Sequence, residues 1–183
     1  MNPIEKNGKT NIIVREFKPK DFEEVIDNYY NIYDEVKQNP WAVGILLFEK
    51  KPSLKDERKW FKEALEKTRN GDGFALVAEV NGKVIGMCDV RNKTPQQEQR
   101  HIGNVGICIR DGYRSMGIGS ALLSELINRA KTKYKILILT LFSSNQIAKN
   151  LYEKFGFVEY GNLPEGILRN GKYKDEIYMY LKL

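Results

Sequence analysis

The segment DGYRSMGIGSALLSEL, residues 111–126, constrains the fold more than any other part of the chain. Gly117 and Gly119 are followed by apolar residues at i, i+3 and i+4 spacing, which predicts an amphipathic helix. The apolar run VGICI at 105–109 comes before this segment and predicts a buried strand. Glycines allow a ligand to approach the backbone, and a helix start offers unpaired N–H groups at the positive end of a dipole. Strand, glycine loop and helix together therefore predict a phosphate-binding site.

Two common nucleotide motifs do not fit this loop. A Walker loop needs Lys and then Ser or Thr after its last glycine, whereas Ser120 and Ala121 follow here. The dinucleotide motif needs three glycines, and GIGSAL supplies two. A second partial match, GILRNGKY at 166–173, leads into an alternating segment, so we interpret it as a turn at Asn170 and Gly171 before the last strand.

Length and composition predict one globular domain over residues 1–183. The chain is 42% hydrophobic and 11% aromatic, and it has no apolar run of the ~18 residues that a membrane span requires. The first ten residues lack the apolar region of a secretory leader. We therefore expect a soluble cytoplasmic protein. Cys88 and Cys108 lie in apolar strand patterns and are expected to be buried free thiols.

The charged residues limit the classes of ligand. A single histidine, His101, excludes a His-rich metal site, and we expect no metal. The net charge of +6 suits a polyanionic cofactor, and because the charges are spread along the sequence, a nucleic-acid-binding domain is only the third alternative.

The remaining patterns predict an α/β protein with a mixed sheet. Asn81 and Gly82 between two apolar runs indicate a hairpin, and 92–100 is expected to be a polar loop. Helices are expected after Pro19, with Phe22, Val25, Ile26, Tyr29 and Tyr33 facing the core, and after Ser53, with Trp60, Phe61, Ala64 and Leu65 facing it. The other expected elements are strands at 11–17, 136–142, 157–160 and 175–183 and a helix at 145–155.

A second motif, NQIAKNLYEKFGF at 145–157, narrows the interpretation. It predicts a helix with Ile147, Ala148, Leu151, Tyr152 and Phe155 on one face and a stop at Gly156. A helix and one apolar strand separate it from the glycine loop Arg114-x-x-Gly117-x-Gly119. This order resembles the GNAT superfamily of acetyl-CoA-dependent N-acetyltransferases, and most of the chain is similar to its branch of phosphinothricin-type and ribosomal-protein N-terminal acetyltransferases.

The resemblance implies a GNAT-like, single-domain, mostly antiparallel mixed sheet flanked by helices, with two splayed central strands. It implies that the glycine loop binds the pyrophosphate of coenzyme A through backbone N–H groups, with Arg114 assisting. The strand at 105–109 would offer its backbone to the pantetheine arm, Asn145 would reach the cofactor nearby, and Tyr152 would protonate the departing thiolate. The implied cofactor-binding residues are Ile107, Cys108, Ile109, Arg114, Ser115, Met116, Gly117, Ile118, Gly119, Ser120, Asn145 and Ala148.

The general base departs from the branch pattern. Asn104 stands where a glutamate is usual, and an amide cannot accept the proton as a base, although it can hold a water. Glu98 and His101 are the other candidates, with Glu79 and Asp89 as weaker ones. Asp175 matches a recurrent aspartate of the branch, and we expect it to contact substrate or to cap the last strand.

The sequence thus predicts direct transfer of acetyl from acetyl-CoA to a primary amine, with no acyl-enzyme. The acceptor is an amino acid, a small amine or a peptide N-terminus, and residues 29–52 and a loop at 162–173 are expected to select it. The lack of a glutamate at position 104 favours α-amines over lysine side chains. A non-catalytic acyl-CoA-binding domain and a protein lysine acetyltransferase are the alternatives, and homodimers are common in the branch.

Overall fold

The computed structural model describes residues 11–183, and the first ten residues, on which the expectation about a secretory leader rests, lie outside the described part. All seven strands join one sheet in the order β1-β2-β3-β4-β5-β7-β6. The strands are β1 (Ile12–Glu16), β2 (Gly73–Val80), β3 (Lys83–Asn92), β4 (Ile102–Ile109), β5 (Ile136–Phe142), β6 (Val158–Arg169) and β7 (Lys172–Lys182). Every neighbouring pair is antiparallel except β4 and β5, which are parallel.

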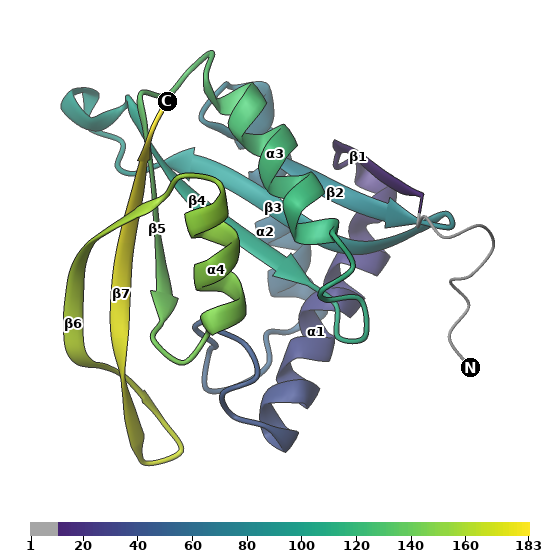
Figure 1. The fold of residues 1–183 in the computed structure, drawn as a ribbon. Helices are drawn as coiled ribbons and strands as arrows, with labels where there is room; N and C mark the ends of the chain where they lie inside the picture. Colours follow the sequence, from purple (N-terminus) through teal and green to yellow (C-terminus); the bar gives the residue numbers. More distant parts are fainter. Residues whose placement is uncertain (1–10) are drawn as a thin grey trace.

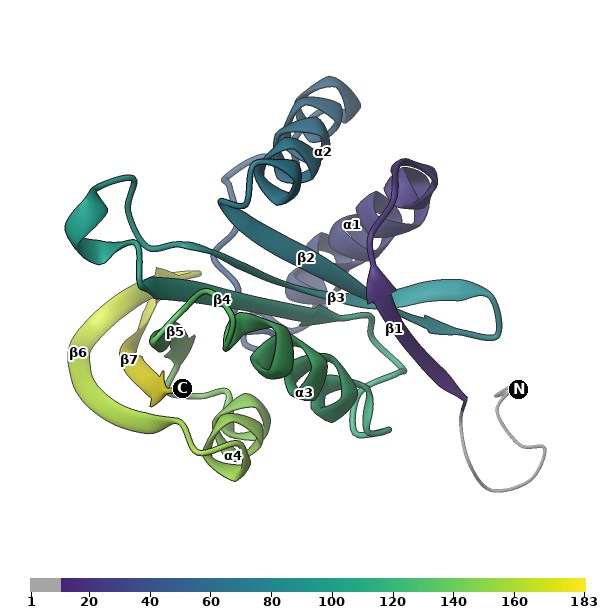
Figure 2. The same ribbon diagram turned by 90° about the horizontal axis from the view of Figure 1, so that it is seen from above.

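Helices cover both faces of the sheet. The helices α1 (Phe22–Gln38) and α2 (Leu54–Arg69) lie on one face, and α3 (Ile118–Ala130) and α4 (Gln146–Lys154) lie on the other (Figures 1 and 2). Two short 3-10 turns, η1 (Pro19–Asp21) and η2 (Gln97–Gln99), complete the set. The fold is therefore the mixed, mostly antiparallel α/β arrangement that the resemblance implied.

Two hydrophobic cores follow from this layering. Beneath α3 and α4, side chains such as Leu76, Leu122, Leu137 and Met179 are fully buried. Beneath α1 and α2, the second core includes Phe22, Val25 and Phe61. Phe61 meets Phe22 edge to face, with ring centroids 5.3 Å apart.

Local signals placed several elements correctly. Ser53 caps α2, where its side chain accepts a hydrogen bond from the Asp56 amide. Asn81 and Gly82 both have positive φ, 51° and 79°, as a tight hairpin turn requires. Asn170 and Gly171 repeat this between β6 and β7, so the segment 166–173 is a hairpin with its turn at these two residues and not a phosphate loop.

Pro19 opens a helix as predicted, with the 3-10 turn η1 preceding the α-helical part that starts at Phe22. Other expectations were wrong. The strand β4 begins at Ile102 rather than at 105. Trp60 is 38% exposed, because the neighbouring Phe61 takes the core position of α2. The expected loop at 162–173 is mostly strand: β6 continues to Arg169, and only the turn at 170–171 separates it from β7. Its pairing to β7 is irregular between Glu159 and Gly161 and again between Leu163 and Ile167, where Pro164 is tolerated in an edge strand.

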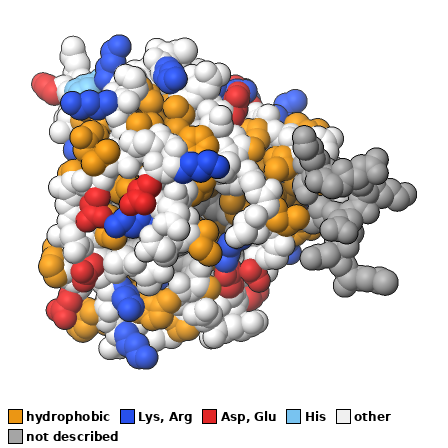
Figure 3. Space-filling view, viewed as in Figure 1, with side chains coloured by type: hydrophobic (Ala, Val, Ile, Leu, Met, Phe, Trp, Pro, Cys, Tyr) orange, Lys and Arg blue, Asp and Glu red, His pale blue; other side chains and the backbone are white. Residues whose placement is uncertain are grey.

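No helix within residues 11–183 is long and apolar enough to cross a membrane. Cationic and anionic side chains are interspersed on the face that carries α3 and α4 (Figure 3). Cys88 is fully buried and Cys108 half-buried, and both are free thiols.

Candidate functional site

The parallel pair β4 and β5 separates after three residue pairs. Ile102 pairs with Ile136, Gly103 with Leu137, and Asn104 with Ile138. No later pair between the two strands forms within the described chain. Beyond that point β4 continues with β3, and β5 continues with β7. The edge of β4 that faces the gap therefore keeps free backbone groups, as the predicted splay requires.

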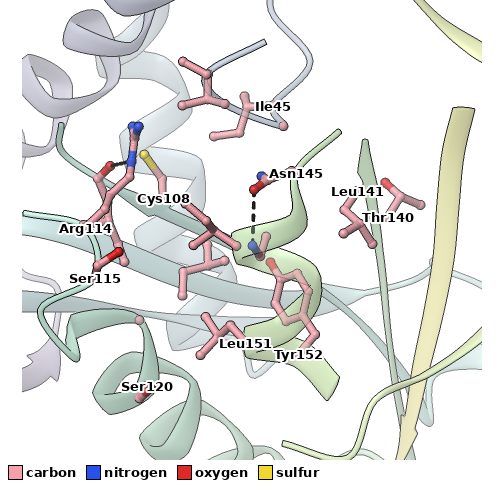
Figure 4. Close-up of a pocket in the computed structure, with 18 of the residues that line it drawn as sticks. Ile45, Cys108, Arg114, Ser115, Ser120, Thr140, Leu141, Asn145, Leu151 and Tyr152 are labelled. Carbon is pink, nitrogen blue, oxygen red and sulfur yellow. Dashed lines mark hydrogen bonds between the residues drawn. The ribbon is translucent and has the colours of Figure 1, made fainter. Parts of the chain in front are cut away.

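A cavity of about 240 Å³ lies where the two strands diverge (Figure 4). Its walls come from five segments that are far apart in sequence: the loop between α1 and α2, the end of β4, the loop before α3, the end of β5, and α4. Ten of the twelve predicted cofactor residues line it, namely Ile107, Cys108, Ile109, Arg114, Ser115, Gly117, Gly119, Ser120, Asn145 and Ala148. The other two are core residues: Ile118 is 1% exposed, and Met116 packs against the core beneath α3 and α4.

The two glycines of the loop have different structural roles. Gly117 has φ of +83° and is the N-cap of α3, and a Cβ there would meet nothing within 4 Å. The N–H groups of the following first turn are left without helical partners at the cavity. Gly119 is required for packing instead, because a Cβ there would approach Leu151 to 3.0 Å and Ile109 to 3.2 Å. The loop thus leaves helix N–H groups accessible after Gly117, as the predicted anion cradle requires, and allows close helix packing at Gly119.

Arg114 is already bonded to protein groups. Its Nη2 donates to Glu35 Oε2 at 2.6 Å, its Nη1 pairs with the other oxygen of the same carboxylate, and its Nε donates to the Ile109 carbonyl at 3.2 Å. The hydrogen-bonded Glu35 carboxylate raises the pKa of Arg114. In this structure Arg114 fastens the glycine loop to α1 and to the end of β4, and its assistance to the pyrophosphate stays a prediction.

Asn145 and Tyr152 enter the cavity from α4. Asn145 is the N-cap of this helix, with its Oδ1 accepting from the Ala148 amide at 3.2 Å. Tyr152 is 6% exposed, packs against Phe157 with ring centroids 5.6 Å apart, and lines the cavity (Figure 4). Burial raises the pKa of the Tyr152 phenol, so the side chain keeps its proton at neutral pH. A protonated phenol beside the cavity is the form that a general acid requires.

Ile147 does not face the core as its spacing predicted. It is 66% exposed and lines the cavity, because the first turn of α4 presents it to the mouth of the site and not to the sheet.

The structure does not bring the predicted bases into this cavity. Asn104 is exposed at the paired end of β4 and lines a separate cavity with Lys67, Arg91 and Arg100. Four residues separate it from Cys108, or about 13 Å of strand. His101 and Glu98 are exposed in the segment before β4, and the His101 carbonyl accepts from the Lys135 amide at 2.9 Å. Their catalytic roles stay predictions.

The weaker acidic candidates also lie outside the cavity lining. Glu79 accepts from Arg15 at 2.9 Å, and Asp89 pairs with Arg91 at 2.7 Å. Asp175 accepts from the Asn162 side chain at 3.1 Å and from the Glu165 amide at 3.0 Å, so it fastens an irregular part of β6.

Two further walls of the cavity come from segments that the sequence analysis named only as regions. The loop between α1 and α2 contributes residues 42–45, which fall within the stretch 29–52 that we expect to select the acceptor, and β5 contributes Thr140 and Leu141. The splay of the strands 105–109 and 136–142 was expected, but no single residue of β5 was named. The loop offered no periodicity or turn motif from which its position could be derived.

Comparison with known proteins decides the family. Residues 27–157 match the family model for the acetyltransferase (GNAT) family. The chain belongs to that family. This confirms the resemblance seen in the sequence and the assignment to the acetyl-CoA-dependent acetyltransferases.

Three relatives illustrate the family relationship. The L-amino acid N-acetyltransferase AaaT of Escherichia coli is 32% identical over 57% of this chain, and the match spans 65% of AaaT. The ribosomal-protein-alanine N-acetyltransferase from Brucella melitensis superposes with a TM-score of 0.79 at 26% identity, covering 93% of this chain and 99% of that one. A phosphinothricin acetyltransferase from Sinorhizobium meliloti, solved with acetyl-CoA, has the same fold, with a TM-score of 0.80, 24% identity, and 94% and 88% of the two chains covered.

Proposed function

We propose that this chain transfers the acetyl group of acetyl-CoA to the α-amine of a free amino acid or of a peptide N-terminus. The observation that carries the proposal is the composition of the cavity wall. Among the described residues that line it, none is Asp, Glu, His or Lys, and the only ionisable side chains are Cys108, Arg114 and Tyr152. No carboxylate or imidazole is therefore at hand to take a proton from an ammonium group.

The absence of a base in this lining favours acceptors that are already partly neutral. A lysine side chain has a pKa near ~10.4 and an α-amine near ~7.8, so lysine starts about 2.6 units, or roughly 3.5 kcal/mol, further from the reactive form at neutral pH. The relatives fit this preference, since AaaT is named for L-amino acids and the Brucella protein for the alanine of a ribosomal protein.

The residues of the cavity fit acetyl-CoA. The first turn of α3 would bind the pyrophosphate through N–H groups, and the free edge of β4 at Ile107–Ile109 would pair with the extended pantetheine arm as another strand would. The neutral amine attacks the thioester carbon, the carbon–sulfur bond breaks, and the amide forms. Tyr152 gives its proton to the sulfur, the proton lost by the amine passes to solvent, and the Tyr152 phenolate takes a proton back from solvent before the next turnover.

Cys108 is not suited to form an acyl-enzyme. Burial raises the pKa of its thiol to about 12, so the nucleophilic thiolate is scarce at neutral pH. Direct attack by the acceptor amine is the route that this environment supports.

An acceptor screen tests the proposal. Release of coenzyme A thiol from acetyl-CoA is followed with amino acids, polyamines and short peptides, with and without N-terminal blocking groups. We expect steady release only with a free α-amine. Tight acetyl-CoA binding without turnover would identify a non-catalytic binding domain, and faster release with blocked lysine peptides would identify a lysine acetyltransferase.

We further propose a homodimer through the edge strand β6. This strand pairs on one side only, and Val158, Tyr160 and Leu163 are each about half exposed, at 48–56%. Apolar side chains on an open sheet edge favour association with another chain. Light scattering with Tyr160→Lys would show a shift to monomer.

Cys88 and Cys108 as free thiols fit a reducing compartment, and we propose the cytoplasm as the location.

A further inference from the structure

The loop between α1 and α2, residues 39–53, is held in place by an arginine from the opposite end of the sequence. Arg169, the last residue of β6, donates to three backbone carbonyls of this loop. The distances are 2.7 Å from Nη1 to the Pro40 oxygen, 3.2 Å from Nη1 to the Val43 oxygen, and 2.5 Å from Nη2 to the Ile45 oxygen. A guanidinium is the side chain with enough donors in a fixed plane to serve three carbonyls at once.

The same guanidinium lies over two aromatic rings. Its central carbon is 5.0 Å from the centre of the Phe142 ring and 5.9 Å from that of Trp41, and these rings meet each other at 6.2 Å. Phe142 is 2% exposed and is the last residue of β5, directly after the cavity residues Thr140 and Leu141. Arg169 therefore joins the loop to the end of the strand that forms the far side of the splay.

Arg169 is half-buried and forms no ion pair with a residue of the described part of the chain. None of its hydrogen bonds within residues 11–183 goes to a carboxylate, and burial lowers its pKa. Carbonyl dipoles and ring faces replace the water that the cation loses. The Arg169 charge is stabilised only while the three loop carbonyls point at it, so the contact depends on the loop having one conformation.

The held loop is a wall of the acetyl-CoA cavity. Ala42, Val43, Gly44 and Ile45 line it, and Ile45 lies across from Asn145 in Figure 4. The approach is close, because a Cβ on Gly44 would lie 2.8 Å from Asn145 Nδ2. A loop displaced by one ångström would either collide with the cap of α4 or open this side of the cavity.

We propose that Arg169 is a positioning residue that holds loop 39–53 as a wall of the acetyl-CoA cavity and so sets the affinity for the cofactor. It touches neither cofactor nor acceptor in this role and acts through the carbonyls of Pro40, Val43 and Ile45. The inference rests on the proposed function only in requiring that this cavity binds acetyl-CoA.

Two substitutions at one site test it. Arg169→Gln removes the charge and most donors, and Arg169→Lys keeps a charge but cannot make the three-carbonyl fork. Hydrogen exchange of the amides at 42–46 and calorimetric titration with coenzyme A are measured for both. We expect faster exchange in this loop and an affinity weaker by roughly 10-fold or more, since small displacements of positioning groups have effects of at least this size.

Arg58→Gln is the matched control. Arg58 also lies over an aromatic ring, 4.4 Å from the centre of Phe22, and pairs with the carboxylate of Glu23. It belongs to α2, which contributes no residue to the cavity lining. We expect coenzyme A affinity within two-fold of wild type for this variant. A global loss of stability in Arg169→Gln would raise exchange everywhere, and Arg169→Lys then decides the outcome.

The inference would be overturned if both Arg169 variants bound coenzyme A within two-fold of wild type, or if exchange at 42–46 stayed unchanged. Failure of the proposed function has a different signature. A wild-type protein that binds coenzyme A but acetylates no α-amine would refute that proposal and leave the exchange and affinity results for Arg169 intact.

Discussion

The two ends of β4 differ in almost every respect. At its beginning, Ile102–Asn104 pair with β5, and Gly103 is packed so closely that a Cβ would lie 2.6 Å from Val90 and 3.2 Å from Tyr134. At its end, Ile107–Ile109 pair with β3 alone and line a cavity. The paired end provides a closed sheet, and the open end provides free backbone donors and acceptors.

The difference shows how a sheet acquires a binding site. The same strand stabilises the core where it has two neighbours and can bind an extended ligand where it has one. The glycine loop, α4 and loop 39–53 gather at the open end, while Asn104, His101 and Glu98 lie at or before the paired end. We therefore place cofactor binding and proton donation at the open end.

The largest effect is expected from Gly117→Asp, which puts a negative charge at the cradle of the open end. The position has φ of +83°, which Asp tolerates better than most residues, and open space around the missing Cβ. Repulsion between two charges about 4 Å apart is worth roughly 4 kcal/mol near a protein surface, so affinity for coenzyme A should fall by about 10²-fold or more. Calorimetry measures it.

Gly117→Asn separates charge from backbone strain. It has the same shape and the same tolerance of positive φ without the charge, and we expect it to lose far less affinity than the aspartate. Equal losses for the two variants would mean that the position matters sterically and that no anion binds there.

Tyr152→Phe tests proton donation at the open end. The ring keeps its packing against Phe157, so the melting temperature should change little. Loss of a positioned acid should lower kcat by roughly 10²-fold. An unchanged kcat would leave Tyr152 as a packing residue of the core.

Gly119→Ala tests the packing role assigned to the second glycine of the loop. The added methyl would press on Leu151 at 3.0 Å and on Ile109 at 3.2 Å, and overpacking of this kind costs about 1–3 kcal/mol of unfolding free energy. Denaturant unfolding measures it. A neutral result would show that α3 and α4 shift apart freely at this contact.

The smallest effect is expected at the paired end. Asn104→Ala should leave coenzyme A affinity within two-fold of wild type, because the residue lines a different cavity. Calorimetry and steady-state kinetics on the same sample test both possible roles. A fall in kcat of more than 10-fold would restore Asn104 to the acceptor side of the reaction, where its amide can hold a water.

A part of the structure could be predicted where the sequence pattern that specifies it is local. The cradle and α4 were predicted because Gly117, Gly119 and the apolar spacing after Asn145 report on neighbours within one or two turns. The strand 136–142 was predicted to the residue for the same reason. Loop 39–53 was not, because its conformation depends on Arg169, more than 120 residues later in the chain.

The burial of residues near the end of a helix or at the edge of the sheet could not be predicted from the sequence either. Ile147 fits a core-facing pattern but faces the cavity mouth, and β6 shows no alternation because both of its faces are largely exposed at the edge of the sheet. The base was predicted by position in a family motif, and motif position does not reveal which cavity a strand residue lines. Asn104 illustrates this, since it lies in the motif strand and outside the cavity.

The central claim is that the site at the open end of β4 transfers acetyl from acetyl-CoA to an amine that arrives in its neutral form. The most direct test compares kcat/KM at pH 7 for two matched peptides, one with a free N-terminus and no lysine, the other blocked at its N-terminus with a single lysine. We predict that the free N-terminus reacts faster, by roughly 10²-fold or more, because its pKa is about 2.6 units lower than that of the lysine side chain. A blocked lysine peptide that reacted as fast or faster would contradict the claim and would require a base that this cavity wall does not contain.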